Sequence, residues 1–239
     1  MKTNSSLLSG CKTLRHRAGF SLVELLVVIA TIALLAAILL PALAAVKKKA
    51  QSISCLNNVR QLDFGVKMYS ADFNSHYPPR SETDRWPNQI YGNYLKNLNV
   101  LLCPSDTNNA PLSSNPGDTN GPDIAPRSYI INGWNDYFEG RTDPTGMNTN
   151  DSISESAIFD PSTTIMFGEK KSHFGDFYMD INGNGANNFG VTDQSRHVGR
   201  SNYGFVDGHA VSIKAPGAVS PRNRWAVGSA DQIWYSLNF

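Results

Sequence analysis

Residues 25–45 read LLVVIATIALLAAILLPALAA, a run of twenty-one residues without a charged side chain and with Thr31 as its one hydroxyl. At helical rise this run is about 32 Å long, which matches the hydrocarbon core of a bilayer, about 30 Å thick. A helix buried in a protein core is the alternative, but such a helix normally keeps a polar face and this run has none. The run therefore predicts a membrane span.

The residues that precede the run are basic. The first nineteen contain Lys2, Lys12, Arg15 and Arg17 and no acid, whereas the whole 239-residue chain has 21 basic and 20 acidic residues and a net charge of +1. Such a balance is not typical of a nucleic-acid binder, so no nucleic-acid partner is expected. Three lysines at 47–49 follow the run, so charge alone favours a cytoplasmic N-terminus only slightly.

One carboxylate lies in the apolar start of this helix. The residues from Gly19 to Leu26 read GFSLVELL, in which Glu24 is the only charge. A charge inside a span costs about 2.5 kcal/mol or more, so Glu24 needs a positive partner. The alternative is a glutamate at the membrane interface that merely ends the span.

This N-terminus resembles those of type IV prepilins and type II secretion pseudopilins. The shared features are a short basic leader ending in Gly19, an apolar first mature residue Phe20, Glu24 as fifth mature residue, and a long apolar helix. The resemblance implies that a prepilin peptidase cuts between Gly19 and Phe20 on the cytoplasmic side and methylates the new amino group. It implies that Glu24 sets the register between subunits by pairing with a neighbour's N-terminal amine. It also implies that Pro41 kinks the helix, since proline removes a helical hydrogen bond.

Apolar residues continue at spacings of three or four from Val46 to Phe73, which predicts one helix from Phe20 to Phe73 that ends before the prolines at 78 and 79. Together with the resemblance, this pattern implies four regions: a removed leader (1–19), a transmembrane and filament-core helix (20–45), its amphipathic continuation (46–73) and a periplasmic, loop-rich β head (74–239).

The residues of the expected head alternate between short strand-like segments and long Gly-, Asn- and Asp-rich loops at 104–126 and 139–152. The predicted fold class is α+β, a pilin-like long N-terminal helix packed on a C-terminal antiparallel β-sheet head. The strand-like segments are Val100–Leu102, Ser128–Ile131, Thr163–Gly168, Tyr203–Val206 and Ala210–Ile213.

The strongest motif of the head joins His197 to Asp207 and Gly208, with nine residues between the histidine and the aspartate. Asp207 and Gly208 predict a tight hairpin in which both residues accept positive φ. The spacing resembles the His, nine residues, Asp-Gly signature of the prepilin-processing-associated group of pseudopilin-like proteins. For His197 a hydrogen bond that positions the hairpin is favoured over a metal or catalytic role. No enzymatic motif stands out, so we expect no enzyme.

The three cysteines divide between the leader and the mature chain. Cys11 lies in the leader, which leaves Cys55 and Cys103 as a pair in an oxidising compartment. A disulfide between the helix and the following loop and two buried free thiols both fit this pair.

Residues 180–185 match the first half of a calcium loop, D-x-N-x-N-G, with Asp180, Asn182 and Asn184 as oxygen ligands and Asp193 near its end. The alternative is an Asn/Gly turn that is capped by its own side chains. No cofactor is required by any motif, and calcium is the one metal suggested.

Two functions remain open. The first is a structural subunit of a type II secretion or type IV pilus-like assembly, with a prepilin peptidase, other pilin-like subunits, the inner membrane and the assembly machinery as partners. The second is a membrane-anchored binding module that recognises exported protein or polysaccharide. Exposed tryptophan rings favour the binding module, and buried rings favour the subunit.

Overall fold

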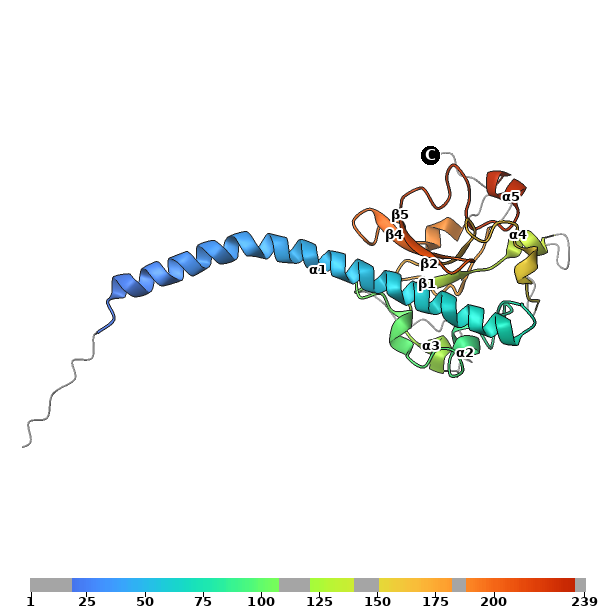
Figure 1. Cartoon of the computed structure of the whole chain (residues 1–239), viewed down its shortest axis with the longest axis horizontal. Helices are drawn as coiled ribbons and strands as arrows, with labels where there is room; N and C mark the ends of the chain where they lie inside the picture. The colour runs from blue at the N-terminus through green and yellow to red at the C-terminus, as the bar shows by residue number, and fades with distance from the viewer. Residues whose placement is uncertain (1–18, 108–120, 140–150, 182–187, 235–239) are drawn as a thin grey trace, which may run out of the picture. The chain divides into compact units, whose positions relative to one another are not determined.

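The computed structural model describes residues 19–107, 121–139, 151–181 and 188–234 (Figure 1). The chain divides into two compact units, Met1–Ala45 and Val46–Phe239. We call the second the head unit. The long helix α1, Leu22–Asp72, contributes its first part to one unit and its last part to the other. The predicted long N-terminal helix is thereby confirmed, to within two residues at its start and one at its end.

In the first unit, α1 exposes apolar side chains on every side. All residues from Leu22 to Ala45 are solvent-exposed, and Pro41 lies inside the helix. The hydroxyl of Thr31 donates to the carbonyl of Val28 at 2.9 Å, so this polar group is satisfied within the helix. By length and composition α1 can cross a membrane, and its place near the N-terminus fits a single-pass anchor.

The head unit is built on a five-stranded mixed sheet with the strand order β3-β1-β2-β4-β5 (Figure 1). The expectation of a purely antiparallel sheet is corrected at one edge, where β3 pairs parallel to β1; the other pairings are antiparallel. The strands are β1 Tyr129–Asn132, β2 Ile165–Glu169, β3 Tyr178–Met179, β4 Arg200–Phe205 and β5 Ala210–Lys214.

Short helical turns lie before, between and after these strands. Residues 100–102, which strand propensity marked as a strand, do not join the sheet; Val100 and Leu101 lie in a 3₁₀ turn instead. The α-helical turns are α2 Trp86–Ile90, α3 Gly121–Ile124, α4 Asn135–Phe138 and α5 Ser229–Trp234. The 3₁₀ turns are η1 Leu98–Leu101, η2 Glu155–Ala157 and η3 Asn188–Val191.

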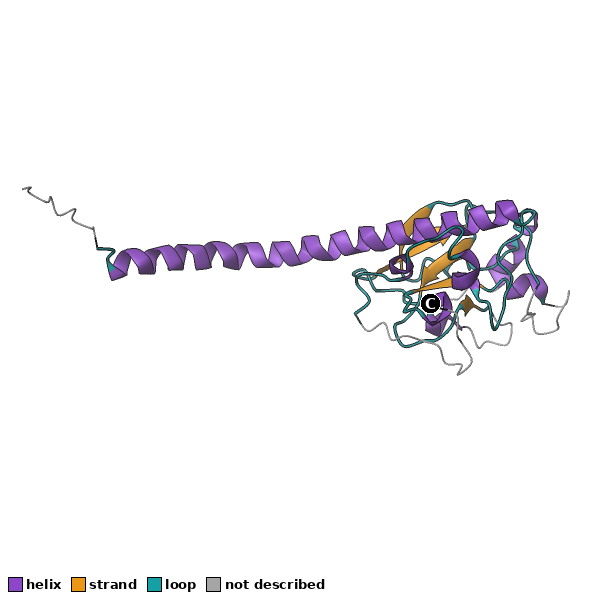
Figure 2. Cartoon of the chain, turned by 90° about the horizontal axis from the view of Figure 1, so that it is seen from below, coloured by secondary structure: helices purple, strands orange, loops and turns teal. Residues whose placement is uncertain are grey.

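The last part of α1 packs on one face of the sheet, where Figure 2 shows it beside the strands. Its buried apolar side chains recur at spacings of four and three: Cys55, Val59, Leu62, Val66 and Tyr69. They share one core with residues of β1 and β2. The apolar stripe predicted from position 46 to position 73 is therefore buried only between Cys55 and Tyr69, since its ends at Val46 and Phe73 are 65% and 49% exposed.

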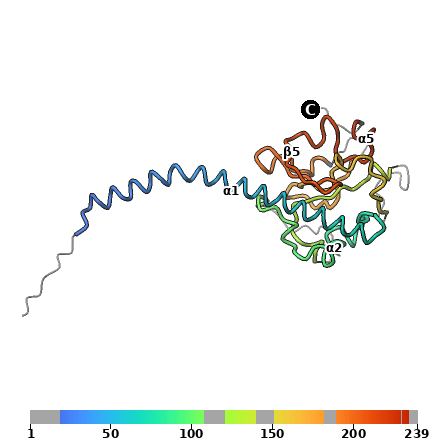
Figure 3. The backbone as a smooth tube through the Cα atoms, viewed as in Figure 1, coloured from blue at the N-terminus to red at the C-terminus, as the bar shows by residue number. Residues whose placement is uncertain are grey.

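A second core covers the opposite face of the sheet. Ile130, Ile165 and Phe205 point into it, and the chain after β5 closes it with Val219 and Trp225; Figure 3 traces this segment from β5 to α5. Because both faces are covered, β1 and β2 are buried at every position.

The β4–β5 hairpin differs from its prediction in one detail. Gly208 has a φ of 95° and its amide donates to the carbonyl of Phe205 at 2.8 Å, whereas Asp207 does not adopt positive φ. Two successive residues with positive φ occur elsewhere, at Asn74 and Ser75 (52° and 60°) and at Val198 and Gly199 (57° and 76°).

Candidate functional site

The predicted processing site precedes the first turn of α1. Gly19 and Phe20 are exposed and non-helical, and apart from the adjacent residues no atom of the described chain lies within 4 Å of the position that a Cβ on Gly19 would take. The described residues, from Gly19 onward, therefore leave the peptide bond between Gly19 and Phe20 accessible to a peptidase.

Glu24 forms a reciprocal capping box with Ser21. The amide of Ser21 donates to Glu24 Oε2 at 2.9 Å, and the amide of Glu24 donates to Ser21 Oγ at 3.1 Å. Two amides that the first turn of the helix leaves unpaired are thereby satisfied. Glu24 thus has a structural role within its own helix, which the Ser-x-x-Glu spacing could have predicted.

In the head, a disulfide joins α1 to the loop after η1. Cys55 and Cys103 are 48 residues apart, and their sulfurs are bonded at 2.02 Å. Of the two alternatives for these cysteines, the structure has the disulfide and not the free thiols.

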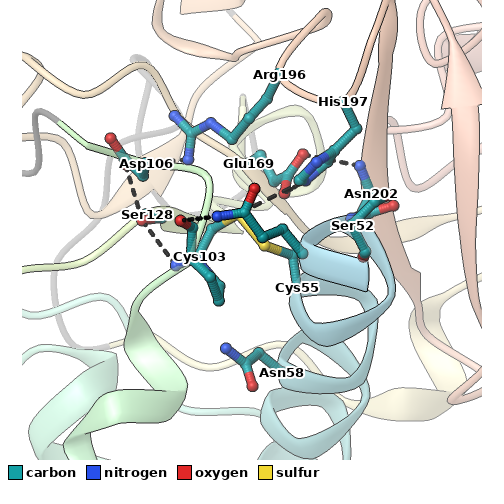
Figure 4. Close-up of a disulfide and its surroundings, with 12 residues drawn as sticks. Ser52, Cys55, Asn58, Cys103, Asp106, Ser128, Glu169, Arg196, His197 and Asn202 are labelled. Carbon is teal, nitrogen blue, oxygen red and sulfur yellow. Dashed lines mark hydrogen bonds and ion pairs between the residues drawn. A yellow bond between two sulfur atoms is a disulfide. The ribbon is translucent and has the colours of Figure 1, made fainter. Parts of the chain in front are cut away.

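His197 and Glu169 lie beside this bond, as Figure 4 shows. His197 Nε2 is 2.7 Å from Glu169 Oε1 and 3.6 Å from Cys103 Sγ. The second carboxylate oxygen of Glu169 accepts from Ser201 Oγ at 2.6 Å and from the Asn202 amide at 2.9 Å. Glu169 therefore holds the start of β4 against the end of β2.

We call Cys55, Cys103, Glu169 and His197 the disulfide cluster. All four are buried, with exposed fractions of 6% or less. Within the described ranges, these are the His, Cys, Asp and Glu side chains whose potential ligand atoms all lie within 4.8 Å of one another.

A second polar network contacts the backbone of Cys103. The amide of Cys103 donates to Ser128 Oγ at 3.0 Å, and Ser128 Oγ donates to Asp106 Oδ2 at 2.8 Å. Arg196, which precedes the signature histidine, forms a buried ion pair with Asp106 at 3.0 Å. Nearby, burial, together with the positive charge of Arg127, lowers the pKa of Lys170 to about 8.

The structure separates the members of the histidine signature. His197 precedes the six-residue strand β4 and Asp207 follows it, so about 20 Å of extended chain lies between them. Asp207 Oδ1 accepts instead from the His209 amide at 3.0 Å. Sequence reasoning missed Glu169, although a single carboxylate at the end of the apolar run IMFGE is a signal of a buried, paired charge.

Both described carboxylates of the predicted calcium loop have arginine partners. Arg80 donates to both oxygens of Asp180, the pair with Oδ2 at 2.9 Å. Asp193 accepts from Arg196 Nε at 3.1 Å. Asn182 and Asn184 lie outside the described residues, so calcium binding stays a prediction.

The tryptophans bear on the choice between subunit and binding module. Trp86, Trp134 and Trp225 have exposed fractions of 0%, 4% and 1%. The ring of Trp86 packs edge-on against Phe167 at 5.1 Å between centroids. The side chain of Trp234 lies outside the described part of the chain. The three described rings are core residues and do not form a stacking platform for a ligand.

A long apolar N-terminal helix and an α+β head define a pilin-like architecture. Residues 14–40 match the family model described as the prokaryotic N-terminal methylation motif. No curated protein and no solved structure matches the chain. The motif supports a type IV pilin-like protein, implies processing by a prepilin peptidase and assembly with other pilin subunits, and points to a structural pilin rather than an enzyme.

Proposed function

We propose that the protein is a pseudopilin-like structural subunit of a type II secretion or type IV pilus-like assembly. It is cut after Gly19, held in the inner membrane by α1 and polymerised through this helix, with its head in the periplasm. The observation that carries the proposal is the methylation motif at residues 14–40 on a helix whose apolar surface is exposed on every side. Such a surface requires lipid or other apolar helices around it.

The chemistry of the head supports this location. A disulfide between Cys55 and Cys103 is suited to an oxidising compartment such as the periplasm. The three buried tryptophans favour a plain subunit over a binding module.

The mature N-terminus tests the proposal directly. The full chain, expressed with a prepilin peptidase, is purified from membranes and its N-terminal peptide is sequenced by mass spectrometry. We expect an N-methylated Phe20. An intact Met1, or a cut after Ala45, would overturn the proposal.

Glu24 can act through its negative charge or through the capping box, and two substitutions separate these roles. Glu24→Gln keeps an acceptor for the Ser21 amide but removes the charge, whereas Ser21→Ala removes one half of the capping box and keeps the charge. If Glu24 pairs with the N-terminal amine of a neighbouring subunit, Glu24→Gln abolishes fibre assembly and Ser21→Ala does not. The reverse result would assign Glu24 to capping alone.

A further inference from the structure

The disulfide cluster combines donor atoms that suit a metal other than calcium. It brings together two cysteine sulfurs, one imidazole nitrogen and one carboxylate oxygen, all within 4.8 Å of one another. Calcium prefers oxygen ligands alone, whereas thiolate with imidazole and carboxylate in a four-donor set is typical of zinc. The sulfurs are bonded in the structure, but the chain is synthesised with both cysteines as thiols.

We propose that the dithiol form of the chain binds one Zn²⁺ in the disulfide cluster, at the place where the oxidised chain has its disulfide. The metal and the disulfide are then alternative crosslinks between α1 and the loop that follows η1. On binding, the two thiols lose their protons to solvent and the imidazole binds in its neutral form.

The distance between Cys103 and His197 already fits this exchange. Tetrahedral zinc places two sulfurs about 3.8 Å apart and a sulfur and a nitrogen about 3.5 Å apart. His197 Nε2 already lies 3.6 Å from Cys103 Sγ. On binding, the two sulfurs must move apart, and so must His197 Nε2 and Glu169 Oε1, which lie 2.7 Å apart where tetrahedral zinc needs about 3.4 Å.

Two of the candidate ligands are also positioned by hydrogen bonds from neighbouring residues, as metal ligands usually are. Glu169 Oε2 is fixed by Ser201 Oγ and the Asn202 amide, and Oε1 lies against His197 Nε2. The amide of Cys103 is held by Ser128.

The test uses the full chain in detergent with Co²⁺ as a spectroscopic substitute for Zn²⁺. A trialkylphosphine first reduces the disulfide: it gives two electrons to the sulfur–sulfur bond and takes up the oxygen of one water, which leaves two thiols and a phosphine oxide. After removal of excess phosphine under argon, the chain is titrated with Co²⁺. We expect a thiolate-to-cobalt charge-transfer band and the intense visible bands of tetrahedral cobalt, which Zn²⁺ removes and which the oxidised chain lacks.

Two histidine variants show which site binds. His197→Gln is expected to weaken Co²⁺ binding at least tenfold. His209→Gln is the matched control, because His209 also pairs with a carboxylate, that of Asp207 at 2.6 Å, but lies outside the cluster. Equal affinity in the two variants would overturn the proposal.

Folding of the reduced chain provides a readout that is independent of the variants. Near-ultraviolet circular dichroism of the reduced wild type is recorded with and without Zn²⁺. Tertiary signal that zinc preserves or restores supports the site. A reduced wild type that gives neither the cobalt bands nor a response to zinc would overturn it.

Discussion

The carboxylate of Asp63 on α1 occupies the space in which a side chain on Gly204 of β4 would begin. Asp63 is fully buried, and neither of its oxygens has a hydrogen-bond partner among the described residues. Burial raises the pKa of Asp63 well above its usual range, which favours the neutral carboxyl. Helix and strand can approach this closely because glycine has no Cβ.

Gly204→Ala should therefore force α1 and β4 apart. We expect the free energy of unfolding in urea to fall by about 1–3 kcal/mol, the usual cost of overpacking a core. Gly190→Ala is the control, because apart from the adjacent residues no described atom lies within 4 Å of its Cβ position; it should change stability by less than about 0.5 kcal/mol.

The same contact predicts coupling between the two positions. In an Asp63→Ala background the space beside β4 is open, so Gly204→Ala should cost less than it does in the wild type, by about 0.5–3 kcal/mol. Strictly additive effects in this double-mutant cycle would show that the carboxylate does not limit the approach.

Stability should depend on pH through Asp136. Burial raises its pKa to about 7, while the Val227 amide, which donates to Oδ2 at 2.6 Å, opposes the rise. Between about pH 4 and pH 7 the folded chain keeps a proton that the unfolded chain has lost, so stability falls as pH rises, by at most about 1.4 kcal/mol per pH unit.

Asp136→Asn removes this titration and keeps an acceptor for the amide. We expect its free energy of unfolding to vary less with pH than that of the wild type over this window, as measured by urea titrations at several pH values. The pKa of Asp63 is raised in both proteins, so the difference between them isolates Asp136. Parallel curves would contradict the assignment.

The disulfide should contribute strongly to the stability of the head. Because it closes a loop with a sequence separation of 48, its loss in a Cys55→Ala, Cys103→Ala variant should cost about 4 kcal/mol on the loop-entropy estimate. Thermal and urea unfolding measure this change. Cys11→Ser, in the predicted leader, is the control and should leave stability unaltered.

Replacing Val198 by a residue that adopts positive φ more readily should stabilise the protein. Val198 is β-branched, is 80% exposed and has a φ of 57°, a conformation that costs an L-residue about 1–2 kcal/mol. Asparagine adopts it more readily, so Val198→Asn should raise the free energy of unfolding by about 0.5–1 kcal/mol. Val198→Thr keeps the branched shape and should give no gain, so an equal gain in both variants would refute the explanation.

The membrane-span helix and the processing motif at the N-terminus could be predicted from local sequence patterns. An uncharged run of twenty-one residues specifies a span-length helix wherever it lies, because its hydrogen bonds join residues four apart and its length matches a bilayer. The residues Gly19, Phe20 and Glu24 form a motif within six positions of the chain. The hairpin of β4 and β5 was likewise predictable, since its strands are neighbours in sequence.

Tertiary structure alone decided the features whose partners lie far apart in the chain. Glu169 meets His197 across 28 positions and Arg80 meets Asp180 across 100, and no periodicity of the sequence pairs them. The parallel pairing of β3 with β1 and the choice of a disulfide over two thiols belong with them. Each of these features depends on which groups are buried side by side. A charge, a strand edge or a thiol that is removed from water must pair with a group that the fold places beside it.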